Sequence, residues 1–147
     1  MLEVDSIAPD FSGSDQHGKT ISLGSLLERG KLVLYFYPKD FTLVCTAQAC
    51  TFRDASSELE GLGTNVVGVS GDSEDSHRRF GEKHSVPFSL LSDPERKIIK
   101  AYDASGIFGR IRRVTYVIGA ERKVLGAFQH ELSAAKHLDD VKRLLNA

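Results

Sequence analysis

The chain has 147 residues, a size that accommodates one domain with a full hydrophobic core, so we predict a single domain over residues 1–147. Apolar residues make up 41% of the chain and charged residues 27%, a balance that excludes a disordered or fibrous protein. The formal net charge of -1 excludes the basic excess of a dedicated nucleic-acid-binding protein, and we expect no nucleic-acid partner.

The first half of the chain predicts a hairpin, a central strand and a long helix. Asp15-Gln-His-Gly18 is a turn signal, and a short extended segment follows at residues 20–23. After a helical turn ending at Gly30, residues 31–37 are apolar and β-rich without alternation, as in a strand covered on both faces. Apolar residues then recur at helical spacing from Cys45 to about Leu62, where glycines end the pattern.

The second half alternates between strands and helices. Residues 65–70 predict a strand, and Asp72 is suited to cap a helix from about Ser73 to His84. Asp93-Pro94 signals the start of a further helix that ends near Tyr102. The remaining predicted elements are a hairpin and a closing helix: strands at 113–118 and 123–129, a turn at 119–122, and a helix over about 133–146.

This order, a β-α-β unit followed by β-β-α, is that of the thioredoxin fold. We therefore expect an α/β protein with a mixed central sheet, helices on both faces and an N-terminal hairpin. The acidic N-terminus has no basic start followed by an apolar run, which predicts a cytoplasmic protein without a secretory signal. The most apolar stretch, residues 32–37, is far shorter than the ~20 residues of a membrane helix, so we expect no membrane partner.

The two cysteines, Cys45 and Cys50, are the residues that point to chemistry. In a reduced compartment such a pair is more often catalytic, redox-active or metal-binding than a structural disulfide. Cys45 lies where the loop after the central strand becomes a helix, and the free N–H groups and positive end of that helix favour a thiolate. Taken alone, Cys45 is equally compatible with a small buried hydrophobic residue.

The spacing of the cysteines restricts what they can do together. Five residues of helix place the two Cα atoms roughly 8.7 Å apart, and a disulfide needs about 7 Å or less. The two therefore cannot bond while the helix is intact, and bonding would require residues from about Thr42 to Phe52 to unwind. One cysteine pair with scattered histidines lacks the usual four ligands of structural zinc, so we predict no metal and no cofactor. His77 and His84 are expected to be surface residues.

The segment Tyr37-Pro-Lys-Asp-Phe-Thr-Leu-Val-Cys-Thr46 resembles the P-x-x-x-T-x-x-C motif of the peroxiredoxins, with Pro38, Thr42 and Cys45 in register. A second cysteine five residues later in the same helix is similar to the peroxiredoxin Q group, also called bacterioferritin comigratory proteins. Further segments resemble recurring segments of that group, in order: Ala8–Phe11, Leu34–Asp40, Gly68–Ser70, Leu90–Asp93 and Arg113–Tyr116.

The resemblance implies an atypical two-cysteine peroxidase that reduces hydrogen peroxide and organic hydroperoxides. Cys45 would be the peroxidatic cysteine and form a sulfenic acid, and Cys50 would resolve it to an intramolecular disulfide. A thioredoxin or similar dithiol would restore the thiols. By the same motif, Pro38 shields the thiolate, Thr42 hydrogen-bonds the thiolate or peroxide, and Arg113 holds both electrostatically. Resemblance to the peroxiredoxin Q group also favours a monomer.

Strand alternation supports the choice of Arg113 over its neighbour. Arg113 shares a face with Thr115 and Val117, whereas Arg112 points to the other face, so only one of the two arginines can line the site. A fixed guanidinium there would stabilise the charge that develops on the leaving oxygen.

The chain departs from the pattern of the group at three positions. Leu43 and Val44 replace a usual Pro-Gly pair, and Gln48 replaces a usual glutamate. These changes bear on rate and substrate preference more than on reaction type. For the two apolar residues between Gly106 and Gly109 we favour ordinary loop packing over a place at the mouth of a pocket.

Two other functions fit the same residues. One is a carrier that exchanges disulfides with protein thiols. The other is a redox sensor that oxidises, unwinds the Cys45 helix and signals through a partner. Sustained peroxide consumption with a thioredoxin system distinguishes a peroxidase from both.

Overall fold

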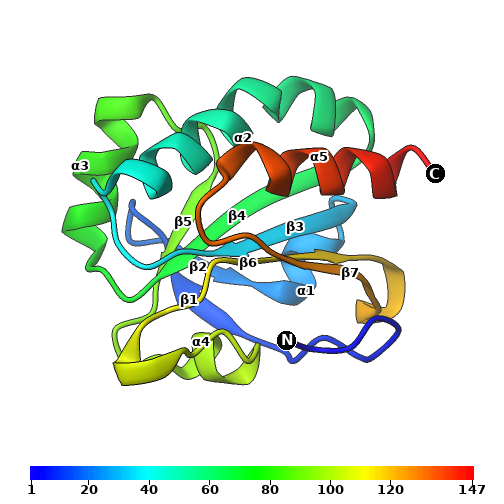
Figure 1. Cartoon of the computed structure of the whole chain (residues 1–147), viewed down its shortest axis with the longest axis horizontal. Helices are drawn as coiled ribbons and strands as arrows, with labels where there is room; N and C mark the ends of the chain where they lie inside the picture. The colour runs from blue at the N-terminus through cyan, green and yellow to red at the C-terminus, as the bar shows by residue number, and fades with distance from the viewer.

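The computed structural model describes all 147 residues and contains one seven-stranded mixed sheet (Figure 1). The strands are ordered β2-β1-β5-β4-β3-β6-β7 across the sheet. Their bounds are β1 Ser12–Ser14, β2 Thr20–Ser22, β3 Lys31–Phe36, β4 Thr64–Ser70, β5 Ser89–Ser92, β6 Val114–Ile118 and β7 Val124–Gln129. β3 pairs in parallel with β4 and antiparallel with β6, which confirms the predicted mixed sheet.

Helices cover both faces of this sheet, as predicted. Helices α2, α3 and α5 contribute to one hydrophobic cluster, and α1 and α4 contribute to the cluster on the other face. Figure 1 shows α2 and α5 side by side above the sheet, with α1 and α4 below it. The helix bounds are α1 Leu23–Leu27, α2 Leu43–Gly61, α3 Glu74–His84, α4 Lys97–Ala101 and α5 Ala134–Leu145.

The central strand β3 is buried on both faces, which explains its unbroken apolar sequence. Alternate side chains enter the two clusters: Leu34 and Phe36 pack with α1 and α4, whereas Val33 and Tyr35 pack against α2. Tyr35 lies directly over Gly68 of β4, where an added Cβ would be only 2.8 Å from the tyrosine ring. The glycine therefore makes room for the large side chain next to the cysteine helix.

The hairpin of β1 and β2 and the hairpin of β6 and β7 are both present where the sequence predicts them. The strand β5, which has four residues and extends the sheet beyond β4, was not predicted. Only Leu90 and Leu91 of β5 are buried, so this strand has too few residues to show a periodic pattern. Its pairing to β1 joins the N-terminal hairpin to the main sheet.

Two predicted helix starts differ in detail from the structure. Ser73, not Asp72, caps α3, because the Ser73 side chain accepts from the N–H of Ser76. The helix expected from Asp93 begins only at Lys97, since Arg96 has a left-handed backbone (φ 60°) that interrupts helical geometry. Asp93 still serves the start of α4, because its carboxylate accepts from the N–H groups of Lys97 and Ile99.

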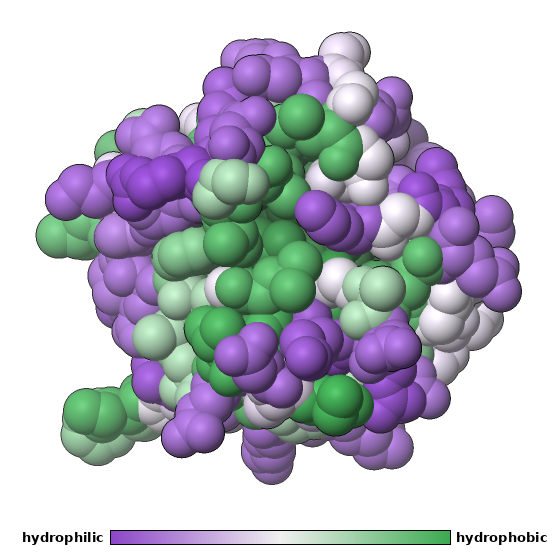
Figure 2. Space-filling model, turned by 90° about the vertical axis from the view of Figure 1, so that its right-hand side faces the viewer, coloured by the Kyte–Doolittle hydropathy of each residue, from purple (hydrophilic) through white to green (hydrophobic).

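The cysteine-bearing start of α2 and the C-terminus lie at opposite ends of the molecule (Figure 1). Figure 2 views the end with the C-terminus, where hydrophobic surface gathers in the middle and hydrophilic residues surround it. None of the helices combines the length and apolar character needed to cross a membrane.

Candidate active site

Cys45 lies in the first turn of α2, and its side chain is buried, with 1% of its surface exposed. The loop from Pro38 to Thr42 connects the end of β3 to this helix. The first turn leaves backbone N–H groups without helical partners and carries the positive end of the helix dipole. The fold therefore presents the sulfur where negative charge is stabilised, as the sequence predicts.

Arg113 reaches Cys45 from the neighbouring strand. The antiparallel register of β3 and β6 pairs Tyr35 with Thr115, and continuing it two residues brings Arg113 to the end of the sheet where α2 begins. Arg113 is 4% exposed, and its Nη1 donates to the Cys45 sulfur at 3.1 Å. A buried guanidinium at this distance stabilises a thiolate, because an arginine stays charged under all ordinary conditions.

The Arg113 side chain is held in place by the segment after β7. The Arg113 side chain donates through Nε to the Glu131 carbonyl at 3.1 Å, and the Arg113 backbone N–H donates to the Glu131 carboxylate at 2.9 Å. This segment is in turn tied to α5, because the buried His137 contacts the His130 carbonyl at 2.8 Å through Nε2 and Thr115 at 2.8 Å through Nδ1. Burial lowers the pKa of His137 to about 4, so its ring is neutral near pH 7.

Gln48 is the second partner of the same guanidinium. Its Oε1 accepts from Arg113 Nη1 at 3.1 Å, and the whole side chain is buried. Its Nε2 has no hydrogen-bond partner. As a neutral amide, Gln48 adds no negative charge that would compete with a thiolate for the Arg113 guanidinium.

An open depression of about 400 Å³ lies at the start of α2 and includes Arg113, the partner of Cys45, in its wall, and we call it the mouth of the site. It is lined by the half-buried Pro38, by Thr42 to Val44 at the start of α2, and by Arg110, Arg113, Glu131 and Leu132. Leu43 and Leu132 are 88% and 86% exposed, which gives the rim two unpartnered apolar side chains. Pro38 and Arg113 are therefore both present at the mouth, where the motif predicts them.

Thr42 also lines this mouth, but its hydroxyl is engaged elsewhere. Thr42 Oγ1 donates to the Lys39 carbonyl at 2.7 Å, and no hydrogen bond joins it to Cys45. The hydroxyl also makes no capping bond to α2. Its predicted contact with a thiolate or peroxide would need a rotation of the hydroxyl group, and that role stays a prediction.

A buried network of polar side chains holds the Pro38–Thr42 loop in place. The Asp40 carboxylate accepts from Tyr37 at 2.6 Å, contacts His77 Nδ1 at 2.7 Å and accepts from Ser76 at 2.8 Å. The Asp40 backbone N–H donates to Asp72 at 2.6 Å. Burial alone would raise the pKa of Asp40, but the hydrogen bonds from these partners outweigh it and lower that pKa.

His77 is completely buried in this network, so its prediction as a surface residue was wrong. Helical spacing alone does not show that α3 turns its His77 side chain under the loop. The ligand atoms of Asp40, Asp72 and His77 lie within 4.8 Å of one another, close enough for a metal ion. They already bond one another or the loop backbone directly, and we assign the cluster to positioning the loop.

Phe41, next to Thr42, adopts a left-handed backbone with φ 63°. This conformation costs a non-glycine residue roughly 1 kcal/mol. The Phe41 ring packs edge-on against Phe80 of α3 at 5.3 Å. Packing and the Asp40 network together hold the loop in a conformation that its sequence alone does not favour.

Cys50 lies on a different side of α2 from Cys45 and is half-buried. Its sulfur is 4.0 Å from Nδ1 of His84, the last residue of α3. Both cysteines are free thiols on the intact helix. The structure therefore places Pro38, Thr42 and Arg113 around one mouth, joins the buried Cys45 to it through Arg113, and leaves Cys50 outside it.

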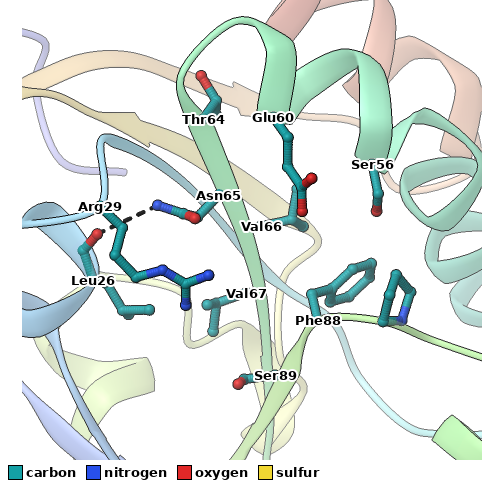
Figure 3. Close-up of a pocket in the computed structure, with 11 residues that line it drawn as sticks. Leu26, Arg29, Ser56, Glu60, Thr64, Asn65, Val66, Val67, Phe88 and Ser89 are labelled. Carbon is teal, nitrogen blue, oxygen red and sulfur yellow. Dashed lines mark hydrogen bonds between the residues drawn. The ribbon is translucent and has the colours of Figure 1, made fainter.

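Two of the other depressions bear on the site or on predictions from the sequence. One, of about 890 Å³, adjoins the mouth through Arg110 and Leu132 and is lined by Ile107, which supports the interpretation of the Gly106–Gly109 loop as part of a pocket rim. The other, of about 110 Å³, lies near the C-terminal half of α2, where Arg29 and Glu60 extend toward it from opposite sides (Figure 3). No cysteine or histidine lines the latter.

The chain is similar to a large set of known proteins. The AhpC/TSA family matches residues 4–127. A chloroplastic peroxiredoxin Q of Sedum lineare is 40% identical over 145 residues, which cover 97% of this chain and 77% of that protein. The chain spans 65% to 77% of the length of the chloroplastic peroxiredoxin Q proteins that it matches in Sedum lineare, Triticum aestivum and Arabidopsis thaliana.

Two solved structures extend the similarity to the fold. Peroxidoxin BcpB of Mycobacterium tuberculosis superposes with a TM-score of 0.94 at 32% identity, covering 99% of this chain and 97% of that one. The bacterioferritin comigratory protein of Xanthomonas campestris, described for its alkyl peroxide reduction activity, superposes with a TM-score of 0.87 at 30% identity, covering 99% and 96%.

Proposed function

The chain belongs to the AhpC/TSA family of peroxiredoxins, which are thiol-dependent peroxidases, and on that premise we propose that Cys45 is the residue that attacks the hydroperoxide. One observation carries this assignment: the buried Cys45 sulfur accepts a hydrogen bond from Arg113 at 3.1 Å. The Cys50 sulfur accepts no hydrogen bond from an arginine and faces a histidine instead. Only Cys45 thus has the surroundings of a stabilised thiolate nucleophile.

In the proposed first step, the Cys45 thiolate attacks one oxygen of the hydroperoxide. A sulfur–oxygen bond forms as the oxygen–oxygen bond breaks, and the leaving oxygen takes a proton to become water or an alcohol. Negative charge moves from sulfur to the leaving oxygen during this step. Arg113, already fixed by Glu131, stabilises that charge without having to rearrange.

We propose that Pro38 and Thr42 shape the approach to this sulfur. Pro38 lies on the wall of the mouth, where its ring limits the access of water to the thiolate. The Thr42 hydroxyl is positioned on the same wall to bond the peroxide once it turns from Lys39. The exposed Leu43 and Leu132 side chains on the rim favour organic hydroperoxides beside hydrogen peroxide, as does the alkyl peroxide activity of the Xanthomonas relative.

The proposed second step joins Cys45 and Cys50 in an intramolecular disulfide. Both lie on the intact α2, where helix geometry separates their Cα atoms by roughly 8.7 Å. The first turns of α2 must therefore unwind before the sulfurs meet. A thioredoxin or similar dithiol then reduces the disulfide by thiol–disulfide exchange, which returns the helix to its starting state.

The test is mass spectrometry of the protein after one equivalent of hydrogen peroxide. We expect the wild type to lose two hydrogens, Cys45→Ser to remain unoxidised, and Cys50→Ser to gain one oxygen and then stall or overoxidise. Equal effects of the two substitutions on the first oxidation would reject the assignment of roles. A wild type that forms the disulfide but consumes no peroxide in steady state with a thioredoxin system would instead favour the redox sensor or disulfide carrier.

A further inference from the structure

We propose that His84 is a further catalytic residue, the base that takes the proton from the Cys50 thiol before that thiol resolves the Cys45 sulfenic acid. The inference rests on the proposed function, because it assigns a role within the second step. It starts from one contact: His84 Nδ1 lies 4.0 Å from the Cys50 sulfur. A thiol must lose its proton to act as a nucleophile, and a neutral imidazole nitrogen accepts protons.

The His84 ring is held against Cys50 by contacts on two sides. Its ring packs on the buried Phe80 of the same helix, with centroids 4.9 Å apart. Its carbonyl accepts from Arg53 Nη1 at 2.7 Å, which ties the end of α3 to α2. Ser85 then turns the chain away with a left-handed backbone, φ 52°. The ring is thus positioned by tertiary packing between two helices.

The charged and titratable groups that meet His84 from α2 are Cys50 and Arg53. Arg53 has no proton-accepting capacity, so His84 is the group placed to take the Cys50 proton. The hydrogen bond to Asp54, and after it the charge interaction with Cys50, raise the pKa of Arg53, so this group keeps its proton. The proposed resolving cysteine, Cys50, therefore has one proton acceptor beside it, His84, on the side of α2 away from Arg113.

The proposed step balances as follows. The Cys50 proton moves to His84, and the Cys50 thiolate attacks the sulfur of the Cys45 sulfenic acid. A sulfur–sulfur bond forms as the sulfur–oxygen bond breaks, and the hydroxide that leaves takes up one proton to become water. The Cys45 sulfur is reduced and the Cys50 sulfur is oxidised, so no further oxidant is needed. Proton transfer precedes unwinding, because Cys50 faces His84 while α2 is intact.

The experiment is a single turnover of the full chain, mixed rapidly with one equivalent of hydrogen peroxide, quenched in acid and followed by mass spectrometry. The sulfenic acid and the disulfide differ in mass, so the two steps are measured separately. The variants are His84→Gln and, as a matched control, His17→Gln, because His17 is exposed and makes no side-chain hydrogen bond to the cysteine region.

We expect the first oxidation to be unchanged in both variants and resolution at pH 7 to be at least tenfold slower in His84→Gln, since general base catalysis typically contributes about 10²–10⁴-fold. Without the base, the resolution rate should follow the thiolate fraction and rise nearly tenfold per pH unit as long as most of the thiol is protonated. The wild-type rate should rise less steeply, so that the two rates converge at high pH.

Three results would overturn the inference. One is an equal rate of disulfide formation in the wild type and in His84→Gln. Another is a decrease of that rate in His84→Gln that is the same at every pH, as a purely structural role would cause. The third is a wild-type profile that itself rises tenfold per pH unit, which requires no variant to fold. Absence of any disulfide in the wild type would instead overturn the proposed function, and the inference with it.

Discussion

Removing the Arg113 guanidinium should slow the oxidation of Cys45 by about 10²–10³-fold. The substitution is Arg113→Met, which keeps the length of the side chain and deletes its charge and donors. In the structure this takes away three side-chain hydrogen bonds, to the Cys45 sulfur, to Gln48 and to the Glu131 carbonyl. The backbone bond from residue 113 to Glu131 does not depend on the side chain and should persist.

The magnitude follows from the distance and the burial of the pair. Unit charges 3.1 Å apart, as for Nη1 and the sulfur, attract by about 5 kcal/mol at an effective dielectric constant of about 20. Part of this attraction is present in the resting thiolate as well as in the transition state. A better guide to the loss of rate is the cost of removing one preorganised donor at other active sites. That cost is about 2.7–4 kcal/mol, or about 10²–10³ in rate.

The assay is the second-order rate of hydrogen peroxide reaction under single-turnover conditions. Arg112→Met is the matched control, since Arg112 is adjacent in sequence but pairs with Asp103 at 3.2 Å on the other side of the strand. Arg113→Met also leaves Gln48 Oε1 without its donor, which should cost about 1–3 kcal/mol of stability. A folded Arg113→Met variant within threefold of the wild-type rate would refute the reasoning.

Two more predictions concern the helix and its surroundings. Hydrogen exchange should show that residues 42–52 lose protection in the disulfide form, because Cys45 and Cys50 cannot bond on an intact helix; equal protection in the dithiol and disulfide forms would contradict unwinding. Burial lowers the pKa of His137 from its usual 6.5 to about 4, so the unfolded chain binds a proton there at a pH at which the folded chain does not. Above about pH 6.5 the free energy of unfolding includes the full contribution of the neutral, buried His137. As the pH falls to about 4, this free energy decreases by about 3 kcal/mol. Urea unfolding of His137→Gln should lack this decline, and a decline equal to that of the wild type would exclude His137 as its source.

The fold could be read from the sequence wherever a segment has enough residues to show a pattern. The continuous apolar run of β3 and the helical spacing of α2 and α5 are long, and each was predicted within a few residues of its observed bounds. The strand β5 was missed because only two of its four side chains are buried. The start of α4 was misplaced because a single left-handed residue, Arg96, interrupts a segment that otherwise looks helical.

The candidate site could be predicted only in its principal parts. Cys45 and Arg113 stand out in the sequence because a motif and strand alternation mark them. Glu131, which holds Arg113, follows an ordinary strand end and carries no local signal. Asp40 and His77 bond each other across 37 residues of chain, so neither reveals the other in sequence.

The sequence by itself determined that a cysteine lies at the start of a helix, behind a central strand, and that a second cysteine follows too close along that helix to bond while it is intact. Periodicity and helix geometry are local properties, and local sequence carries them. Only the tertiary structure decided what each thiol faces: Arg113 from β6 for Cys45, and His84 from the end of α3 for Cys50. Arg113 is 68 residues from Cys45 and His84 is 34 residues from Cys50 in the chain. The pairing of strands and the packing of helices bring these partners within reach of the sulfurs.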